Sequence, residues 1–220
     1  MTAENITSHL RSLGLKDAPF GRRTTIYPPE GSPRFDQVLW LAQGRVLEFT
    51  TALNGEKAAL SITYPHSLLG VDSILDGNCQ MGAEALEGCT GIYIPKNRLD
   101  ELLNNPTFLR QLNEQQARQH RFAVQIDTDK RKKSLPSLAS LFLNLEGYDL
   151  AYGFDQTRTV DLLNQDEIAR LISVTKAQAY RYVSELVDRG LVQKINLTVT
   201  TSSGYRITNK EGLQELAESQ

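Results

Sequence analysis

The segment from Gln165 to Val183, QDEIARLISVTKAQAYRYV, constrains the fold more than any other part of the chain. Its apolar residues recur at three- and four-residue intervals in two runs, and a short break separates the runs. This spacing predicts two short helices joined by a tight turn, which is the pattern of a helix-turn-helix. The expected core residues are Ile168, Ile172, Val174, Ala179 and Tyr182, with small Ala169 where the helices cross.

The second of these helices has an exposed face suited to DNA. Thr175 can cap the helix, because its hydroxyl can accept a free backbone N–H of the first turn. Lysine and arginine suit guanine, and glutamine suits adenine. The alternative is a pair of packed helices with no role in DNA binding. The sequence departs from the usual motif at Ser173, where a turn glycine is common. The candidate DNA-contacting residues on this helix are Thr175, Lys176, Gln178, Tyr180, Arg181 and Ser184.

A hairpin is expected after the helix-turn-helix. β-branched residues alternate along Val192–Ile195, Leu197–Thr200 and Tyr205–Ile207, with a turn at Ser202–Gly204. A helix-turn-helix followed by a hairpin predicts a winged helix. Lys194 lies in the wing and is expected to contact a phosphate.

The first half of the chain favours β structure. After a short helix over Ile6–Leu15, short apolar runs alternate with turn residues from Thr24 to Ile94, and Asn54-Gly55 is a strong hairpin signal. Such a pattern predicts an antiparallel barrel or sandwich. The expected strands are Val38–Leu41, Arg45–Thr50, Ala58–Tyr64 and Gly91–Ile94.

A long helix is expected over residues 107–130, after a helical turn or two from Lys96 to Leu103 and Pro106 at a helix start. A long helix with a narrow apolar stripe favours a dimer seam. Packing of one helix on the β domain is the alternative. The stripe contains Phe108, Leu109, Leu112, Phe122 and Ile126, and the seam is predicted to use Leu112, Gln116, Gln119, Phe122 and Ile126.

Four basic residues, Lys130 to Lys133, follow this helix. Two interpretations stay open: a solvated hinge, or a DNA phosphate contact beside Ser134 at the start of the next helix, Leu135–Leu145. A loop is expected over Gly147–Thr159 and a last helix over Asn209–Glu218.

Composition excludes several classes of protein. The net charge of −2 argues against a generally basic coat for nucleic acid, so DNA contacts must come from a local patch. Cys79 and Cys89 lack a metal-ligand spacing, and no nucleophile motif, P-loop or dinucleotide fingerprint occurs, so no metal, no cofactor and no enzymatic activity are expected. Without a membrane-spanning run or a signal peptide, the protein is expected to be cytoplasmic.

Together these features resemble the Crp/Fnr (catabolite activator) family of bacterial transcription regulators. The resemblance rests on Asn105-Pro106, on Leu141–Leu145 and on Asp166–Val183. It implies an α+β fold with an N-terminal antiparallel β-roll like a cyclic-nucleotide-binding domain, a long central dimerisation helix and a C-terminal winged helix-turn-helix. The expected divisions are 1–105 for the roll, 106–133 for the helix and hinge, and 134–220 for the DNA-binding domain. Within the family, Leu69-Gly70-Val71 with Ser73-Ile-Leu and Gly77-Asn78 is most similar to the cyanobacterial nitrogen-control branch.

The effector site departs from the family pattern. Nucleotide-binding members have Gly-Glu after the roll and then an arginine that neutralises the cyclic phosphate. Here Val71 follows Gly70, the arginine position falls near Cys79-Gln80, and no arginine occurs between Arg45 and Arg98. A buried phosphate without a partner charge is costly, so cyclic AMP is not expected to bind. The residues expected at the effector pocket are Leu69, Gly70, Val71, Asp72, Cys79, Gln80, Phe122 and Ala123.

The sequence therefore predicts a homodimeric, sequence-specific regulator that binds double-stranded DNA, with RNA polymerase as a candidate partner, no membrane partner and an unknown effector. The alternative is a small-molecule sensor whose winged helix docks a protein partner. The operator, the target genes and the sign of regulation do not follow from the sequence.

Overall fold

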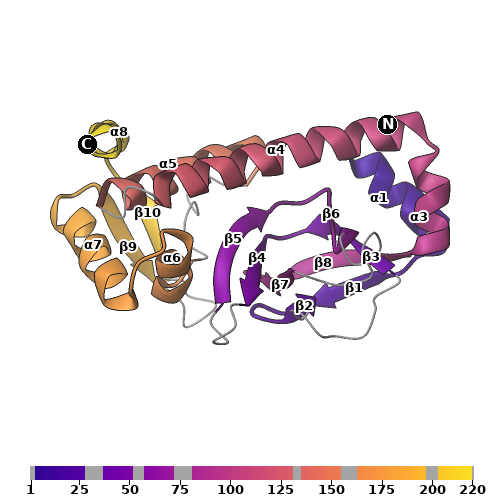
Figure 1. The fold of residues 1–220 in the computed structure, drawn as a ribbon, viewed down its shortest axis with the longest axis horizontal. Helices are drawn as coiled ribbons and strands as arrows, with labels where there is room; N and C mark the ends of the chain where they lie inside the picture. The colour runs from indigo at the N-terminus through magenta and orange to yellow at the C-terminus, as the bar shows by residue number, and fades with distance from the viewer. Residues whose placement is uncertain are drawn as a thin grey trace. The chain divides into compact units, whose positions relative to one another are not determined.

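The computed structural model describes residues 3–27, 37–51, 57–71, 81–130, 135–154, 163–196 and 203–219. The chain divides into two compact units, residues 1–123 and 124–220. In the residues described, the first unit contains two antiparallel sheets with helices beside them, and the second is mostly helical with a hairpin (Figure 1). This is the α+β fold that the sequence predicts. The predicted division into three parts stays a prediction.

The first unit is a β-roll. One sheet has the strand order β1-β8-β3-β6, and the other has the order β2-β7-β4-β5. The strands are β1 (Asp17–Phe20), β2 (Thr25–Tyr27), β3 (Gln37–Gln43), β4 (Val46–Thr51), β5 (Lys57–Thr63), β6 (Ser67–Leu69), β7 (Gly82–Ala85) and β8 (Cys89–Pro95).

The predicted strands of this unit are present, but the β structure begins earlier than expected. Strand structure begins at Asp17, before Thr24, because β1 pairs with β8 in register Asp17↔Ile92. The expected hairpin joins β4 and β5, which pair up to Thr51↔Lys57, and its tip at Asn54-Gly55 lies outside the described residues.

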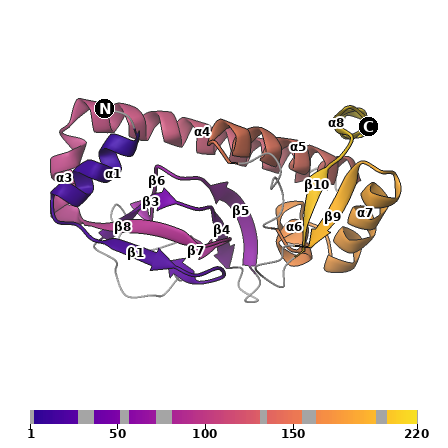
Figure 2. The same cartoon turned by 180° about the vertical axis from the view of Figure 1, so that it is seen from behind.

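Helices α1 (Ala3–Ser12), α3 (Lys96–Leu103) and the first part of α4 (Pro106–Lys130) cover one side of the roll (Figures 1 and 2). Ile6 and Leu10 of α1 join Trp40 of β3 and Phe108 of α4 in one buried cluster. The indole Nε1 of Trp40 donates a hydrogen bond to Thr7 Oγ1 at 3.0 Å, so the buried polar group of this core is satisfied. The N-terminal helix is therefore part of the core of this unit.

A polar network joins α4 to the second sheet. Ser61 Oγ and Thr63 Oγ1 of β5 each donate to Glu48 Oε2 at 2.8 Å, and Gln119 Nε2 of α4 donates to Thr63 Oγ1 at 3.3 Å. Beside it, the rings of Tyr64 and Phe122 meet edge to face, 6.2 Å between centroids. The apolar stripe of α4 thus packs on its own β domain.

Buried Cys89 lies at the start of β8. Its Sγ donates a hydrogen bond to the Arg45 carbonyl oxygen at 3.3 Å, and burial raises the pKa of the Cys89 thiol to about 11. Next to it, Arg45 Nε lies 3.0 Å from Glu87 Oε1, and the Arg45 side chain is only 7% exposed.

The second unit has a core of helices against a two-stranded sheet. Leu138, Phe142, Ile168 and Leu186 are buried in it, and the ring of Phe142 stacks on Tyr205 at 6.0 Å. Helix α5 runs on to Ala151, where the sequence predicted a loop from Gly147. The elements are α5 (Leu135–Ala151), α6 (Gln165–Leu171), α7 (Lys176–Asp188), β9 (Val192–Asn196), β10 (Ser203–Ile207) and α8 (Lys210–Glu218).

Candidate nucleic-acid interface

Helix α6 begins with a capping box. Asn164 Oδ1 accepts the Glu167 N–H at 2.9 Å, and Glu167 Oε2 accepts the Asn164 N–H at 2.6 Å. Both backbone donors would otherwise have no partner inside the helix. The Asn164-x-x-Glu167 spacing was readable in the sequence as this signal. Ile168, Ala169 and Ile172 are buried, as predicted.

The turn between α6 and α7 contains Ser173 with φ of 55°, in the left-handed region that favours glycine. Ser173 is exposed, and the next residue, Val174, is half-buried. The turn therefore has the conformation that a turn glycine usually provides, and a serine adopts it at a cost in free energy.

Helix α7 begins at Lys176 with a second capping box. Thr175 Oγ1 accepts the Gln178 N–H at 3.2 Å, which confirms the predicted cap. In return, Gln178 Oε1 accepts hydrogen bonds from the Thr175 N–H and hydroxyl, both at 3.0 Å. While this box is intact, Thr175 occupies the amide oxygen of Gln178, so only the amide N–H groups are left for another partner. Bidentate recognition of adenine needs the amide oxygen as well. The T-x-x-Q spacing carries this signal, and it competes with the assignment of Gln178 to base reading.

The buried face of α7 consists of Ala179, Val183 and Leu186. Tyr182, expected in the core, is only half-buried, because the buried positions continue at four- and three-residue spacing from Ala179. The guanidinium carbon of Arg181 lies 5.4 Å from the centroid of the Tyr182 ring, a cation–π distance.

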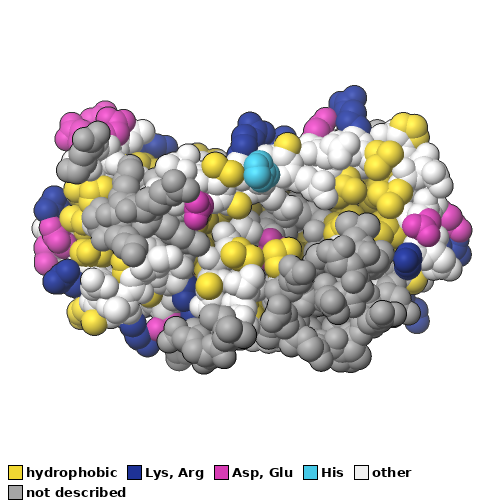
Figure 3. Space-filling view, in the orientation of Figure 1, with side chains coloured by type: hydrophobic (Ala, Val, Ile, Leu, Met, Phe, Trp, Pro, Cys, Tyr) yellow, Lys and Arg dark blue, Asp and Glu magenta, His cyan; other side chains and the backbone are white. Residues whose placement is uncertain are grey.

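The opposite face of α7 is available to a partner. Tyr180 is 59% exposed, Arg181 and Lys176 are exposed, and Ser184 is half-buried. Lys176 Nζ lies 3.0 Å from Asp166 Oδ1 of α6. On the face drawn in Figure 3, basic and acidic side chains lie next to one another over α7.

The wing is an antiparallel pair, β9 with β10. Ser203 and Gly204, expected in the turn, instead lie in β10, where Gly204 pairs with Ile195. Lys194 is exposed on β9. The Gln165 side chain hydrogen-bonds Tyr205, whose pKa is raised by burial. The start of α6 is thereby tied to the wing. The expected strand Leu197–Thr200 and the candidate contact Ser134 lie outside the described residues.

Part of the predicted effector pocket lies in the described residues. Leu69 is buried at the end of β6, Gly70 has φ of 78°, and Val71 packs on the cluster below α1. Phe122 is buried and Ala123 half-buried. Asp72, Cys79 and Gln80 lie outside the described residues, so the pocket as a set stays a prediction.

The predicted seam residues divide by burial. Leu112, Phe122 and Ile126 are 8%, 1% and 3% exposed in the single chain, Gln119 is half-buried, and Gln116 is exposed. On α4, the described large apolar side chains that stay exposed are Leu109 at 37% and Val124 at 50%. The seam stays a prediction, and neither of these two exposed apolar residues belongs to the set predicted for it.

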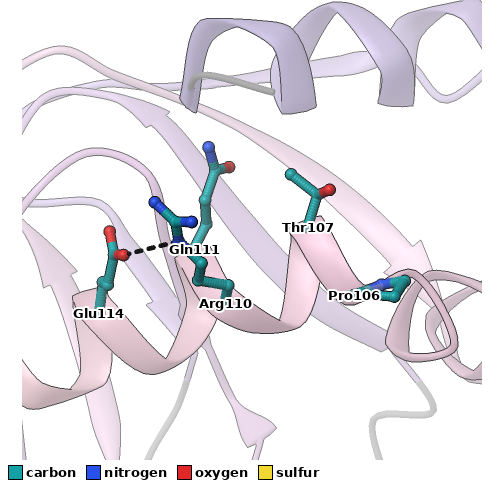
Figure 4. Close-up of a pocket in the computed structure, with 5 residues that line it drawn as sticks. All are labelled: Pro106, Thr107, Arg110, Gln111 and Glu114. Atoms are coloured by element: carbon teal, nitrogen blue, oxygen red, sulfur yellow. Dashed lines mark hydrogen bonds and ion pairs between the residues drawn. The ribbon is translucent and has the colours of Figure 1, made fainter.

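A pocket of about 370 Å³ lies at the start of α4 (Figure 4). Arg110 Nε is 3.1 Å from Glu114 Oε1 along one edge. Within the described ranges, no group of three or more metal-ligating side chains comes together, and no helix has the length and apolar character to cross a membrane. The described residues that line the pocket are Pro106, Thr107, Arg110, Gln111 and Glu114.

Sequence comparison finds distant relatives of this chain among known proteins. No model of a known protein family matches the chain. The chain is 26% identical over 160 residues to the transcriptional activator protein Anr of Pseudomonas protegens. The alignment covers 72% of this chain and 66% of Anr. The chain is likewise 26% identical over 165 residues to the anr protein of Pseudomonas aeruginosa, covering 74% and 67%. The aligned part thus spans about two thirds of these relatives.

Solved structures share the fold. TTHA1359, a CRP/FNR-family transcriptional regulator from Thermus thermophilus, superposes with a TM-score of 0.71 at 17% identity, over 93% of this chain and 99% of that one. FixK2 from Bradyrhizobium japonicum gives 0.71 at 15% identity, over 94% and 98%. The chain thus shares the fold of solved Crp/Fnr-family structures and is similar in sequence to two transcriptional activators. The predicted resemblance of this chain to the cyanobacterial nitrogen-control branch stays a prediction.

The conformation of the turn at Ser173 gives a stability prediction. Replacing Ser173 with glycine should raise the free energy of unfolding by about 1 kcal/mol, because a Cβ at positive φ is strained. Ser173→Ala keeps the Cβ and is the matched control, with little change expected. Denaturant unfolding of the three proteins measures the difference. A glycine variant less stable than the alanine variant would show that the turn is unstrained.

Proposed function

We propose that this chain is a homodimeric regulator that reads a specific DNA site with α7 and contacts phosphates with the wing. The observation that carries the proposal is the exposed face of α7, capped at Thr175 and carrying Lys176, Tyr180 and Arg181 opposite a fully buried face. A helix presented in this way fits the major groove. The relatives named transcriptional activators support this role. RNA polymerase is a candidate partner of an activator of this kind.

Arg181 is proposed to read a base. Its guanidinium is exposed, and the Tyr182 ring lies beside it at 5.4 Å. A planar guanidinium can donate two hydrogen bonds to one guanine. Lys194 in the wing and Lys176 at the helix start carry point charges suited to phosphate, or in the case of Lys176 to a base edge.

Two alanine variants test these roles against an operator selected from random DNA. Arg181→Ala should cost about 1–3 kcal/mol of binding free energy and relax preference at one base pair per half-site. Lys194→Ala should weaken all sequences alike and lower the salt slope by about one. Gel shifts over a substitution series of the operator give both readouts.

Two results would count against this assignment. If Arg181→Ala weakened every sequence equally, Arg181 would hold phosphate rather than a base. If the wild-type protein bound no duplex, the winged helix would serve the other role considered, docking of a protein partner.

The dimer is proposed to form along α4, through the face that contains the exposed apolar side chains. At 100° per residue, Leu109 and Val124 lie about 60° apart around the helix, and exposed Asn113, Ala117 and His120 fall in the same sector of roughly 80°. An apolar and neutral-polar stripe on a long helix suits a two-fold seam. The buried residues Phe108, Leu112 and Phe122 already pack against the roll, so they are not the residues proposed to contact a second copy.

Val124→Glu should weaken the dimer at least tenfold, because it places like charges across the two-fold axis. Gln125→Glu adds the same charge at the next, also exposed, position and should leave the dimer intact. Sedimentation equilibrium measures both dissociation constants. A wild-type protein that stays monomeric at micromolar concentration would overturn the dimer proposal.

The effector is proposed not to be cyclic AMP. Arg45, the last arginine before Arg98 in the sequence, is buried against Glu87. The polar network under α4 includes the Glu48 carboxylate, which disfavours an added phosphate nearby. A cyclic phosphate near Glu48 would therefore meet a carboxylate, and the guanidinium of Arg45 is already paired with Glu87.

Calorimetry should therefore detect no binding of cyclic AMP at concentrations up to about a millimolar, and cyclic AMP should leave operator affinity unchanged. A micromolar dissociation constant would overturn this prediction while leaving the DNA-reading assignment in place.

A further inference from the structure

Asp166 and Lys176 form an ion pair across the helix-turn-helix. Lys176 Nζ lies 3.0 Å from Asp166 Oδ1 and 3.1 Å from Oδ2. Asp166 belongs to the first turn of α6, and Lys176 is the first residue of α7. The pair therefore joins the N-terminal ends of the two helices that make the motif.

Stability of the fold does not account for this pair. The Lys176 side chain is 65% exposed and the Asp166 side chain 46%. Exposed ion pairs contribute little to the free energy of unfolding, because water and salt screen them. A lysine at a helix N-terminus is moreover unfavourably placed toward the helix dipole, which favours anions there. The carboxylate of Asp166 offsets that charge at the end of α7.

The same position matters for DNA. The N-terminus of α7, with its capped backbone and the Lys176 ammonium, is where a phosphate or base edge is proposed to lie. A carboxylate 3.0 Å from that ammonium both competes for it and repels phosphate. A phosphate anywhere on a random duplex must overcome this carboxylate, whereas a correct site can supply further base contacts that offset it.

We infer that Asp166 is a specificity-determining residue, which holds Lys176 and lowers affinity for non-specific DNA more than affinity for the operator. The inference rests on the proposed DNA-reading function. Discrimination depends on the ratio of the two affinities, so a repulsive element that weakens the wrong complex raises it.

Asp166→Asn tests this, alone and combined with Lys176→Ala. Asp166→Asn should tighten binding to random duplex at least threefold, steepen the salt slope by about 0.9 as Lys176 gains a phosphate, and lower the ratio of operator to random affinity. In the Lys176→Ala background the same substitution should have less than half of its effect. Thermal unfolding should be nearly unchanged.

Asp188→Asn is the matched control, because it removes the same charge from an exposed position at the far end of α7. Equal effects of Asp166→Asn and Asp188→Asn would reduce the result to net charge and overturn the inference. So would an Asp166→Asn effect that persists in full without Lys176. A wild-type protein that binds no duplex would instead show that the proposed function itself fails.

Discussion

The polar face of α7 is defined by what its other face packs against. Ala179, Val183 and Leu186 are buried, and α7 lies against α5, α6 and β9. Because those three positions fix the rotation of the helix, they also fix which side chains point outward. Two capping boxes set where α6 and α7 begin, and the Gln165–Tyr205 hydrogen bond holds the start of α6 to the wing. DNA contacts placed on such a frame need little ordering on binding.

Helices with distinct start signals could be predicted closely. Residues 96–103 and the starts at Pro106, Leu135 and Gln165 agree with the sequence, since proline, capping residues and apolar periodicity act locally. Strand β1 was missed because it holds only Asp17–Phe20, contains Pro19 and is defined by pairing with the distant β8. Long-range pairing leaves no local pattern in so short a segment.

The candidate site shows the same limit at the level of side chains. The exposed face of α7 followed from periodicity, but the partners of its side chains did not. Gln178 is committed to the cap of its own helix, and Lys176 to a carboxylate ten residues earlier in the chain. The stripe on α4 was equally ambiguous, since an apolar face predicts burial without naming the surface that buries it. Only the fold shows that Phe108 packs with Trp40 and Phe122 with Tyr64.

The environment of Cys89 bears on oxidation chemistry. Its pKa of about 11 leaves roughly one molecule in ten thousand as thiolate at neutral pH. Peroxides and disulfides react with the thiolate, so this sulfur is a poor nucleophile while β8 stays folded. Oxidants should therefore react only slowly with Cys89 in the native protein. Its modification would report local opening of the roll, which makes alkylation of this residue a practical probe of how often that part of the protein unfolds.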